Sequence, residues 1–187
     1  MDLWLQDFKQ QVTIAGFRDV KIEDIDKLLQ IVRDKTDVAV QFFNASLIAG
    51  WEHLLFVALN ALNAFKCKVN ISNSVAMETL LYASAQRQIK EAVRLMGIKT
   101  RTSCIAVLIL AATSKEASVT LKIVTRFVGG KRDDSVLEFT DDKVAALKRL
   151  FKISNVELEA KMEQKGAERK ALADLILEHV ALLVTQR

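Results

Sequence analysis

The chain has 187 residues, of which 51% are hydrophobic and 27% are charged, and its formal net charge is +4. This length and apolar fraction suit one compact domain over residues 1–187 and exclude an intrinsically disordered chain. The charge is compatible with nucleic-acid binding but is far from that of a polybasic protein.

Cysteine content and the N-terminal sequence predict a cytoplasmic location. Cys67 and Cys104 are too few for a disulfide framework, which favours a thiol-reducing compartment. The opening M-D-L-W lacks the basic and apolar regions of a secretory signal. The run Ala45–Phe65 is the strongest membrane-span candidate, but a glutamate, a histidine and two asparagines interrupt it, so we expect a buried helix and no membrane association.

The first part of the chain alternates between strand and helix patterns. Lys9–Ile14 predicts a strand ended by Ala15 and Gly16, and Glu23–Arg33 has the apolar spacing of a helix. Val38–Phe43 predicts a second strand. A largely apolar helix is expected from about Leu47 to Cys67, and it should lie centrally in the fold.

The segment Glu78–Ile98 predicts one amphipathic helix that Ser74 caps and Gly97 ends. Its apolar residues recur at helical spacing and would form one core-facing stripe: Met77, Leu81, Ala85, Ile89, Ala92, Val93 and Met96. The opposite face would carry a basic row, which we define as Arg87, Lys90 and Arg94. Glu91, four residues after Arg87, can neutralise part of this row.

The second half predicts a buried strand and several helices. The strand is Cys104–Ala112, and the helix Lys115–Val128 should follow it, closed by two glycines. Ser135–Phe139 predicts a short edge strand. Further helices are expected from Thr140, over Ser154–Met162 and over Ala167–Gln186. We therefore predict an α+β fold with a small, mainly antiparallel sheet of about four strands packed against several helices.

No catalytic or metal-binding motif is present in the sequence. His53, Cys67, Cys104 and His179 form no local ligand pair, so no metal and no cofactor are expected. Gly129-Gly130-Lys131 lacks the spacing of a phosphate loop. We expect no enzyme activity. A thiol enzyme using Cys67, which lies between two lysines, remains the catalytic alternative.

Two motifs resemble a known family. E-T-L-L-Y-A-S-A-Q-R-Q-I at Glu78–Ile89, with its Gly-Ile stop and following apolar strand, resembles the small subunit of the KEOPS complex, called the PRPK-binding protein in mammals. The Q-R-Q-I form is more similar to archaeal members. K-R-L-F-K-I-S at Lys148–Ser154 is similar to a second segment of the family, and the likeness extends over most of the chain from about Asp37.

The resemblance implies a non-catalytic regulatory subunit. Members of the family act in making threonylcarbamoyladenosine at position 37 of tRNA, bind the kinase-like ATPase subunit of KEOPS and hold the 3′ CCA end of the tRNA. Contact with RNA needs cations for phosphates and amides or hydroxyls for base and ribose edges. The residues that would supply them are Ser84, Arg87, Gln88, Lys90, Arg94, Lys66 and Lys68, with Tyr82 as a stacking ring. The plainer alternative is a solvated surface.

The last predicted helix is more apolar than one core-facing stripe requires. Its candidate partner-contacting residues are Leu172, Leu175, Ile176 and Val180. Homodimer formation or simple burial explains the same pattern. A protein-interaction adaptor that does not bind RNA is therefore the main alternative to the tRNA-binding subunit.

Overall fold

A computed structural model of the chain describes residues 1–162, 164 and 166–185. The chain divides into two compact units, each built from two separate segments. Met1–Ser46 and Gly97–Leu137 form the first unit, and Leu47–Met96 and Glu138–Arg187 form the second. The expectation of one domain over residues 1–187 stays a prediction.

The first unit contains a five-stranded sheet in which every strand pair is antiparallel. Its strands are β1 (Asp2–Leu5), β2 (Gln10–Arg18), β3 (Ala39–Asn44), β4 (Ile105–Ala111) and β5 (Lys131–Arg132). The order is β1-β2-β4-β3, and the short β5 pairs with the end of β2. Every residue of β4 is buried, as its continuous apolar run predicts. The α+β fold with a small antiparallel sheet is confirmed.

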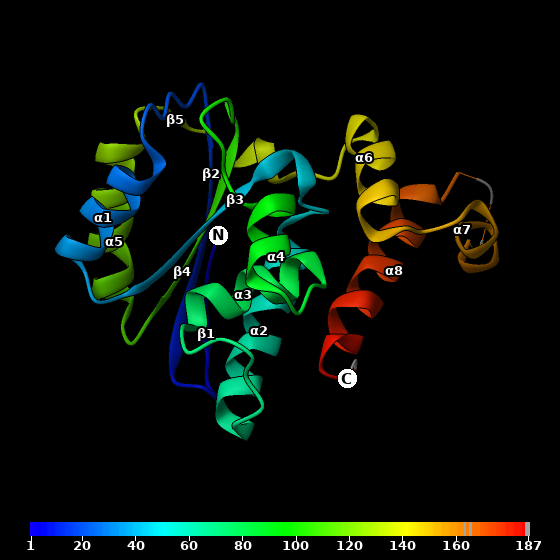
Figure 1. Ribbon diagram of the computed structural model, residues 1–187, viewed down its shortest axis with the longest axis horizontal. Helices are drawn as coiled ribbons and strands as arrows, with labels where there is room; N and C mark the ends of the chain where they lie inside the picture. The colour runs from blue at the N-terminus through cyan, green and yellow to red at the C-terminus, as the bar shows by residue number, and fades with distance from the viewer. Residues whose placement is uncertain (163, 165, 186–187) are drawn as a thin grey trace. The chain divides into compact units, whose positions relative to one another are not determined.

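Two helices, α1 (Ile25–Lys35) and α5 (Ser114–Val128), lie side by side on one face of this sheet (Figure 1). Their apolar residues pack with Phe17, Val107 and other strand residues in one buried cluster. Each helix begins at a residue whose side chain accepts a backbone hydrogen bond, as helix termini require. Gly129, with a φ of 71°, ends α5 as expected.

The sequence misplaces the elements around Gly16. Strand β2 does not end at Ala15 and Gly16 but continues to Arg18, and β1 precedes it. A Cβ at Gly16 would lie 2.5 Å from both Asp133 O and Val136 Cγ2, so glycine here permits the close approach of a later segment. That later segment is a 3₁₀-helix, η2 (Asp134–Leu137), which shows that the predicted strand Ser135–Phe139 is wrong.

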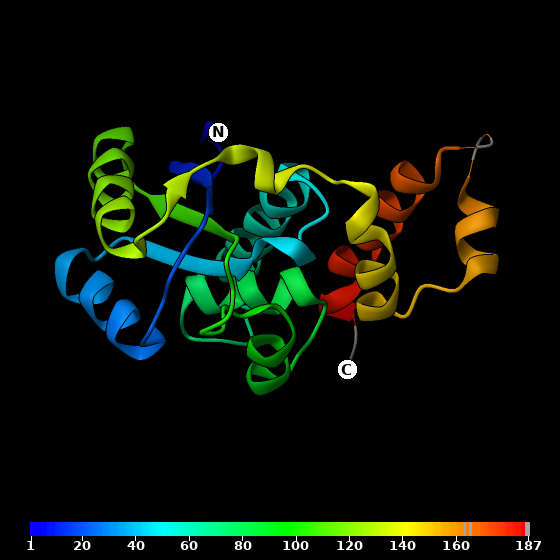
Figure 2. The same ribbon diagram turned by 90° about the horizontal axis from the view of Figure 1, so that it is seen from above.

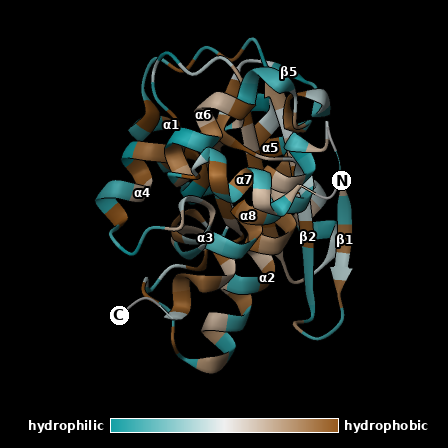
Figure 3. Ribbon diagram, turned by 90° about the vertical axis from the view of Figure 1, so that its right-hand side faces the viewer, coloured by the Kyte–Doolittle hydropathy of each residue, from teal (hydrophilic) through white to brown (hydrophobic). Residues whose placement is uncertain are grey.

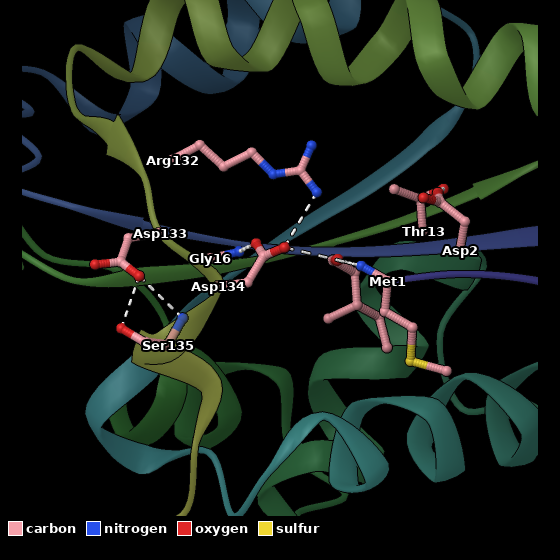
Figure 4. A network of polar contacts seen from close by, with 9 residues as sticks. Met1, Asp2, Thr13, Gly16, Arg132, Asp133, Asp134 and Ser135 are labelled. Carbon is pink, nitrogen blue, oxygen red and sulfur yellow. Dashed lines mark hydrogen bonds and ion pairs between the residues drawn. The ribbon is translucent and has the colours of Figure 1, made fainter.

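Aspartate side chains explain why the segment after β5 turns instead of extending. The Asp133 carboxylate accepts hydrogen bonds from the backbone N–H and the hydroxyl of Ser135. The Asp134 carboxylate accepts one from Gly16 N at 2.8 Å and another from the Arg132 guanidinium (Figure 4). Side chains that bond nearby backbone in this way favour turns over strands.

The second unit is helical. Its helices are α2 (Trp51–Cys67), α3 (Val75–Ser84), α4 (Ile89–Met96), α6 (Asp141–Phe151), α7 (Asn155–Lys161) and α8 (Glu168–Leu182), and the short 3₁₀-helix η3 (Leu183–Thr185) follows α8. The 3₁₀-helix η1 (Ala45–Leu47) begins in the first unit and ends at the first residue of the second. Helix α2 begins at Trp51 and not near Leu47, because Gly50 at its N-cap has a φ of 96°. Gln186, the predicted last residue of α8, lies outside the described residues.

One apolar cluster organises α6, α7 and α8. Leu147, Phe151 and Ile153 pack there with residues of α8. Ser154 begins α7 with a capping box that includes Glu157. The segment Lys148–Ser154, one of the two that carry the family resemblance, therefore supplies core residues and a helix cap.

None of the helices in residues 1–162, 164 and 166–185 is both long enough and apolar enough to span a bilayer.

Candidate functional site

The predicted helix over Glu78–Ile98 is wrong, because two helices occupy this segment. Helix α3 ends at Ser84, and Ala85 adopts a left-handed conformation with a φ of 49°. Backbone hydrogen bonds from Ala85 N to Tyr82 O and from Gln86 N to Leu81 O, both 3.0 Å, close the end of the helix. Since glycine usually occupies such a position and alanine does so here, the sequence gives no sign of the break.

The break rotates α4 relative to the predicted stripe. Ala92 and Met96 face the core, whereas Ile89 and Val93 are 44% and 43% exposed. Lys90 and Arg94 are also exposed on α4. Figure 3 shows hydrophilic and hydrophobic colours together along this helix. The exposed surface of α4 is therefore part apolar and part cationic.

The basic row does not form one straight line of free cations. Arg87 lies in the turn between α3 and α4, and its Nη1 donates to Leu183 O at 3.5 Å. Glu91 pairs with Arg94 and not with Arg87, with N–O distances of 2.8 and 2.9 Å. The Arg94 hydrogen bond lowers the pKa of Glu91. Gln88 and Lys90 are exposed.

Two predicted RNA-contacting side chains on α3 are buried. Ser84 is 1% exposed, and its hydroxyl donates to Leu80 O at 2.9 Å, which leaves it unavailable to ribose. Tyr82 is 3% exposed, and burial raises the pKa of its phenol. Both side chains occupy core positions in this structure, and the RNA contact expected of them stays a prediction.

Sequence reasoning missed Glu78, a fully buried carboxylate in the first turn of α3. It accepts hydrogen bonds from Ile71 N at 3.1 Å and Ser72 N at 2.7 Å, and so closes the loop between α2 and α3. The position of an acid in a first helical turn was the available sign. The motif that carries the family resemblance thus holds the fold together through Glu78, Tyr82 and Ser84.

Lys66 and Lys68 lie at the C-terminal end of α2, and Lys68 caps that helix with a φ of 58°. A short loop then leads into α3, at whose far end Arg87 follows. The ten residues of α3 span about 15 Å at the helical rise. The structure therefore does not gather these lysines with Arg87 into one patch.

The apolar excess of α8 is mostly core. Leu172, Ile176 and Val180 are completely buried, and Leu175 packs partly buried against the same unit's apolar cluster. These three side chains face the core in this structure, and their contact with another chain stays a prediction. The exposed apolar residues are instead Leu182, the last residue of α8, at 55%, and Val184 of η3 at 47%. Figure 2 shows the red end of α8 next to the green helices, in agreement with the bond from Arg87 to Leu183 O.

His53 and His179 both pack edge-on against the ring of Phe151. Within the residues that the structure describes, no group of three or more His, Cys, Asp or Glu side chains could hold a metal ion. His53 is 1% exposed, and its Nδ1 accepts a hydrogen bond from Ala49 N at 3.3 Å. Burial lowers the pKa of His53 to about 4, so the ring is neutral at physiological pH.

Comparison with known proteins identifies the family of the chain. Residues 17–183 match the family described as kinase binding protein CGI-121. The chain belongs to this family. It is also 36% identical over 113 residues to the regulatory protein Cgi121 of Methanocaldococcus jannaschii, an alignment that covers 60% of this chain and 70% of that relative. The resemblance to the archaeal form of the small KEOPS subunit is confirmed for this CGI-121 chain.

Proposed function

We propose that this chain is a non-catalytic subunit of a KEOPS-type complex that binds the kinase-like ATPase subunit and recruits tRNA through its 3′ CCA end for threonylcarbamoyladenosine formation. The observation that carries the proposal is the match of residues 17–183 to the kinase-binding CGI-121 family. A KEOPS-type regulatory role agrees with the regulatory name of the M. jannaschii relative.

The proposed partner surface combines the end of α8 with the exposed apolar residues of α4. The hydrogen bond from Arg87 to Leu183 O brings the α3–α4 turn next to the end of α8. Exposed Ile89 follows this turn, and exposed Leu182 precedes Leu183. Apolar side chains in this neighbourhood can contact a partner without unfolding the core, which Leu172, Ile176 and Val180 cannot.

The proposed RNA surface is the exposed polar part of the same turn and helix. Arg87, Gln88 and Lys90 are exposed, and they supply the cation and amide types that phosphates and base edges require. Arg94 has five N–H donors and uses two of them in hydrogen bonds to Glu91, so three stay available for RNA. Lys66 and Lys68 would then contact the RNA separately, about one length of α3 away. The mechanism is affinity, with chemistry in other subunits.

A second candidate is an adaptor that binds its kinase partner and not RNA. It is favoured by the engagement of two of the three cations of the basic row within the chain, Arg87 with Leu183 and Arg94 with Glu91. Ion pairs and hydrogen bonds at exposed sites contribute little to stability, so they do not prevent these side chains from turning to a stronger anionic ligand.

A gel-shift titration with intact tRNA and with the same tRNA trimmed of its CCA end tests the proposal. We expect intact tRNA to bind more tightly, with an affinity that falls as salt rises. Equal affinity for both forms would refute recruitment through the CCA end. Binding to neither form, together with retained binding of the kinase-like subunit, would establish the adaptor without RNA binding.

A further inference from the structure

The first unit carries a groove that shares no residue with the α3–α4 turn or with α4. Two adjoining hollows of about 460 and 450 Å³ lie between α5 and the edge of the sheet formed by β1 and β5. They share three lining residues, Ser118, Leu121 and Arg132, which makes them one continuous depression. We call it the α5 groove.

The floor of the α5 groove is polar although it lies on the sheet. Along β2, Gln11 and Thr13 point to the same face as Ala15 and Phe17, because side chains alternate along a strand. The Ser114 hydroxyl donates to Gln11 Oε1 at 2.9 Å, and the Thr13 hydroxyl donates to Asp2. The apolar half of this face belongs to the core, and the polar half lines the groove.

Three cations line the groove against one carboxylate. Lys122 and Arg126 extend from α5, Arg132 comes from β5, and Asp2 is the single acidic lining residue among those described. Figure 4 shows the Arg132 side chain lying below α5, with its guanidinium held by Asp134 at 3.1 Å. This contact uses one of five guanidinium donors and orients the others. The groove therefore favours an anionic ligand.

An exposed indole lies at one end of the groove. Trp4 is 44% exposed on β1, which pairs only with β2 among the described strands. Its ring nitrogen donates to Gln6 Oε1 at 2.9 Å, and this bond limits rotation of the ring. Large exposed rings beside cations are the elements with which proteins bind single-stranded nucleic acid, since each base can stack and each phosphate can pair.

We propose that the α5 groove binds single-stranded RNA. Lys122, Arg126 and Arg132 contact successive phosphates, and a base stacks on Trp4. The Ser118 hydroxyl is placed to reach a phosphate or ribose oxygen. An acidic peptide would use the cations and the free edge of β1 but would gain little from the indole, so the indole favours RNA. This inference goes beyond the proposed function, because its residues belong to the first unit and need no CCA end.

The test uses Trp4 as its own reporter. In a Trp51→Phe background Trp4 is the single tryptophan, and an oligouridylate of roughly eight nucleotides matches the site size of such grooves. We expect the oligonucleotide to quench Trp4 fluorescence. Lys122→Glu should weaken binding about tenfold and lower the slope of log affinity against log salt by about 0.7.

Lys27→Glu in the same background is the matched control, because it makes the same charge change on an exposed residue of α1. It should bind the oligonucleotide like the parent. If the Lys122→Glu and Lys27→Glu proteins bind the oligonucleotide with equal affinity, the proposal is overturned. This holds whether or not the chain binds tRNA through its CCA end. A polyglutamate peptide of equal charge that binds with the same affinity as the RNA would also overturn it.

Discussion

The Glu78 carboxylate accepts a 2.7 Å hydrogen bond from the backbone N–H of Ser72, six residues earlier in the chain. The same carboxylate accepts from Ile71 N, and the side chain of Glu78 is fully buried. A charged acceptor is thus surrounded by donors from one loop. Hydrogen bonds to charged groups are stronger than neutral ones, and unpaired buried donors are costly.

Replacing Glu78 should therefore destabilise the fold without touching the exposed surface. We expect Glu78→Ala to lower the free energy of unfolding by about 3 kcal/mol, and Glu78→Gln by less, since the amide keeps one acceptor oxygen. Urea unfolding followed by circular dichroism measures both. Glu159→Ala, at an exposed glutamate of α7, should change stability by less than about 0.5 kcal/mol. Equal losses for the Glu78 and Glu159 variants would contradict the buried-acceptor role.

The buried ring of His53 predicts a loss of stability in mild acid. Burial lowers its pKa from an ordinary 6.5 to about 4, and the backbone of Ala83 opposes this only partly. As pH falls below 6.5, the unfolded chain takes up a proton that the folded chain excludes. Stability is therefore fully present above pH 6.5 and falls by about 3 kcal/mol towards pH 4.

The control for His53 is a variant without the titrating ring, whose free energy of unfolding is measured over the same pH range. His53→Asn keeps an acceptor for Ala49 N but has no proton to take up, so the difference in stability between parent and variant should narrow from pH 7 to pH 4. His179→Asn, at a half-buried histidine, should leave the parent's slope largely in place. An unchanged difference across this range would show that His53 is protonated in the folded chain.

The sequence predicts most of the fold because burial and caps have local patterns. The run Cys104–Ala112 identifies β4, and Gly129 identifies the end of α5. What it cannot predict depends on contacts between distant residues. Strand β2 runs through Gly16 because that glycine accommodates Asp133 and Val136, more than a hundred residues later. The left-handed Ala85 has no pattern of its own.

The candidate site is less predictable than the fold because exposure decides which side chains can bind. Ser84 and Arg87 belong to the same sequence motif and both have polar side chains. Yet Ser84 is buried, and Arg87 lies in a turn. The sequence of α8 likewise shows more apolar residues than one core-facing stripe needs. It does not indicate that Leu172 and Val180 face the core and that Leu182 is exposed. These distinctions depend on how the helices pack in three dimensions, which cannot be read from one sequence.

Gly16→Ala should destabilise the first unit. The added Cβ would lie 2.5 Å from Asp133 O and Val136 Cγ2, and moving the η2 segment would strain the bond from Gly16 N to Asp134. We expect a loss of about 1–3 kcal/mol, as for other overpacked sites. Adding Val136→Ala should restore part of this loss in thermal unfolding, because it removes one of the two clashes. No recovery in the double variant would place the strain at the backbone oxygen alone.

Charged residues on α8 should separate core from partner surface. Ile176→Asp puts a charge at a completely buried position and should unfold the second unit, whereas Leu182→Asp, at a 55% exposed position, should not. Circular dichroism distinguishes them. If Leu182 contacts the kinase-like subunit, Leu182→Asp should also reduce co-purification with it. A folded Leu182→Asp protein that binds this subunit like the parent would remove the end of α8 from the proposed interface.

Arg87→Glu should weaken tRNA binding while leaving the fold nearly intact. The change removes a cation and adds a repelling charge where the RNA backbone would pass, so the salt slope should fall by about one unit. Its intramolecular contact is a single 3.5 Å bond to Leu183 O from an exposed side chain, so we expect a stability change below about 1 kcal/mol. Gel-shift titration at low salt measures the affinity. Arg87→Lys, which keeps the charge, should lose less affinity, and Lys27→Glu makes the same charge change on α1 of the first unit. If Arg87→Glu binds tRNA as tightly as Lys27→Glu does, Arg87 serves only to hold the end of α8, and the proposed RNA contact at this turn is wrong.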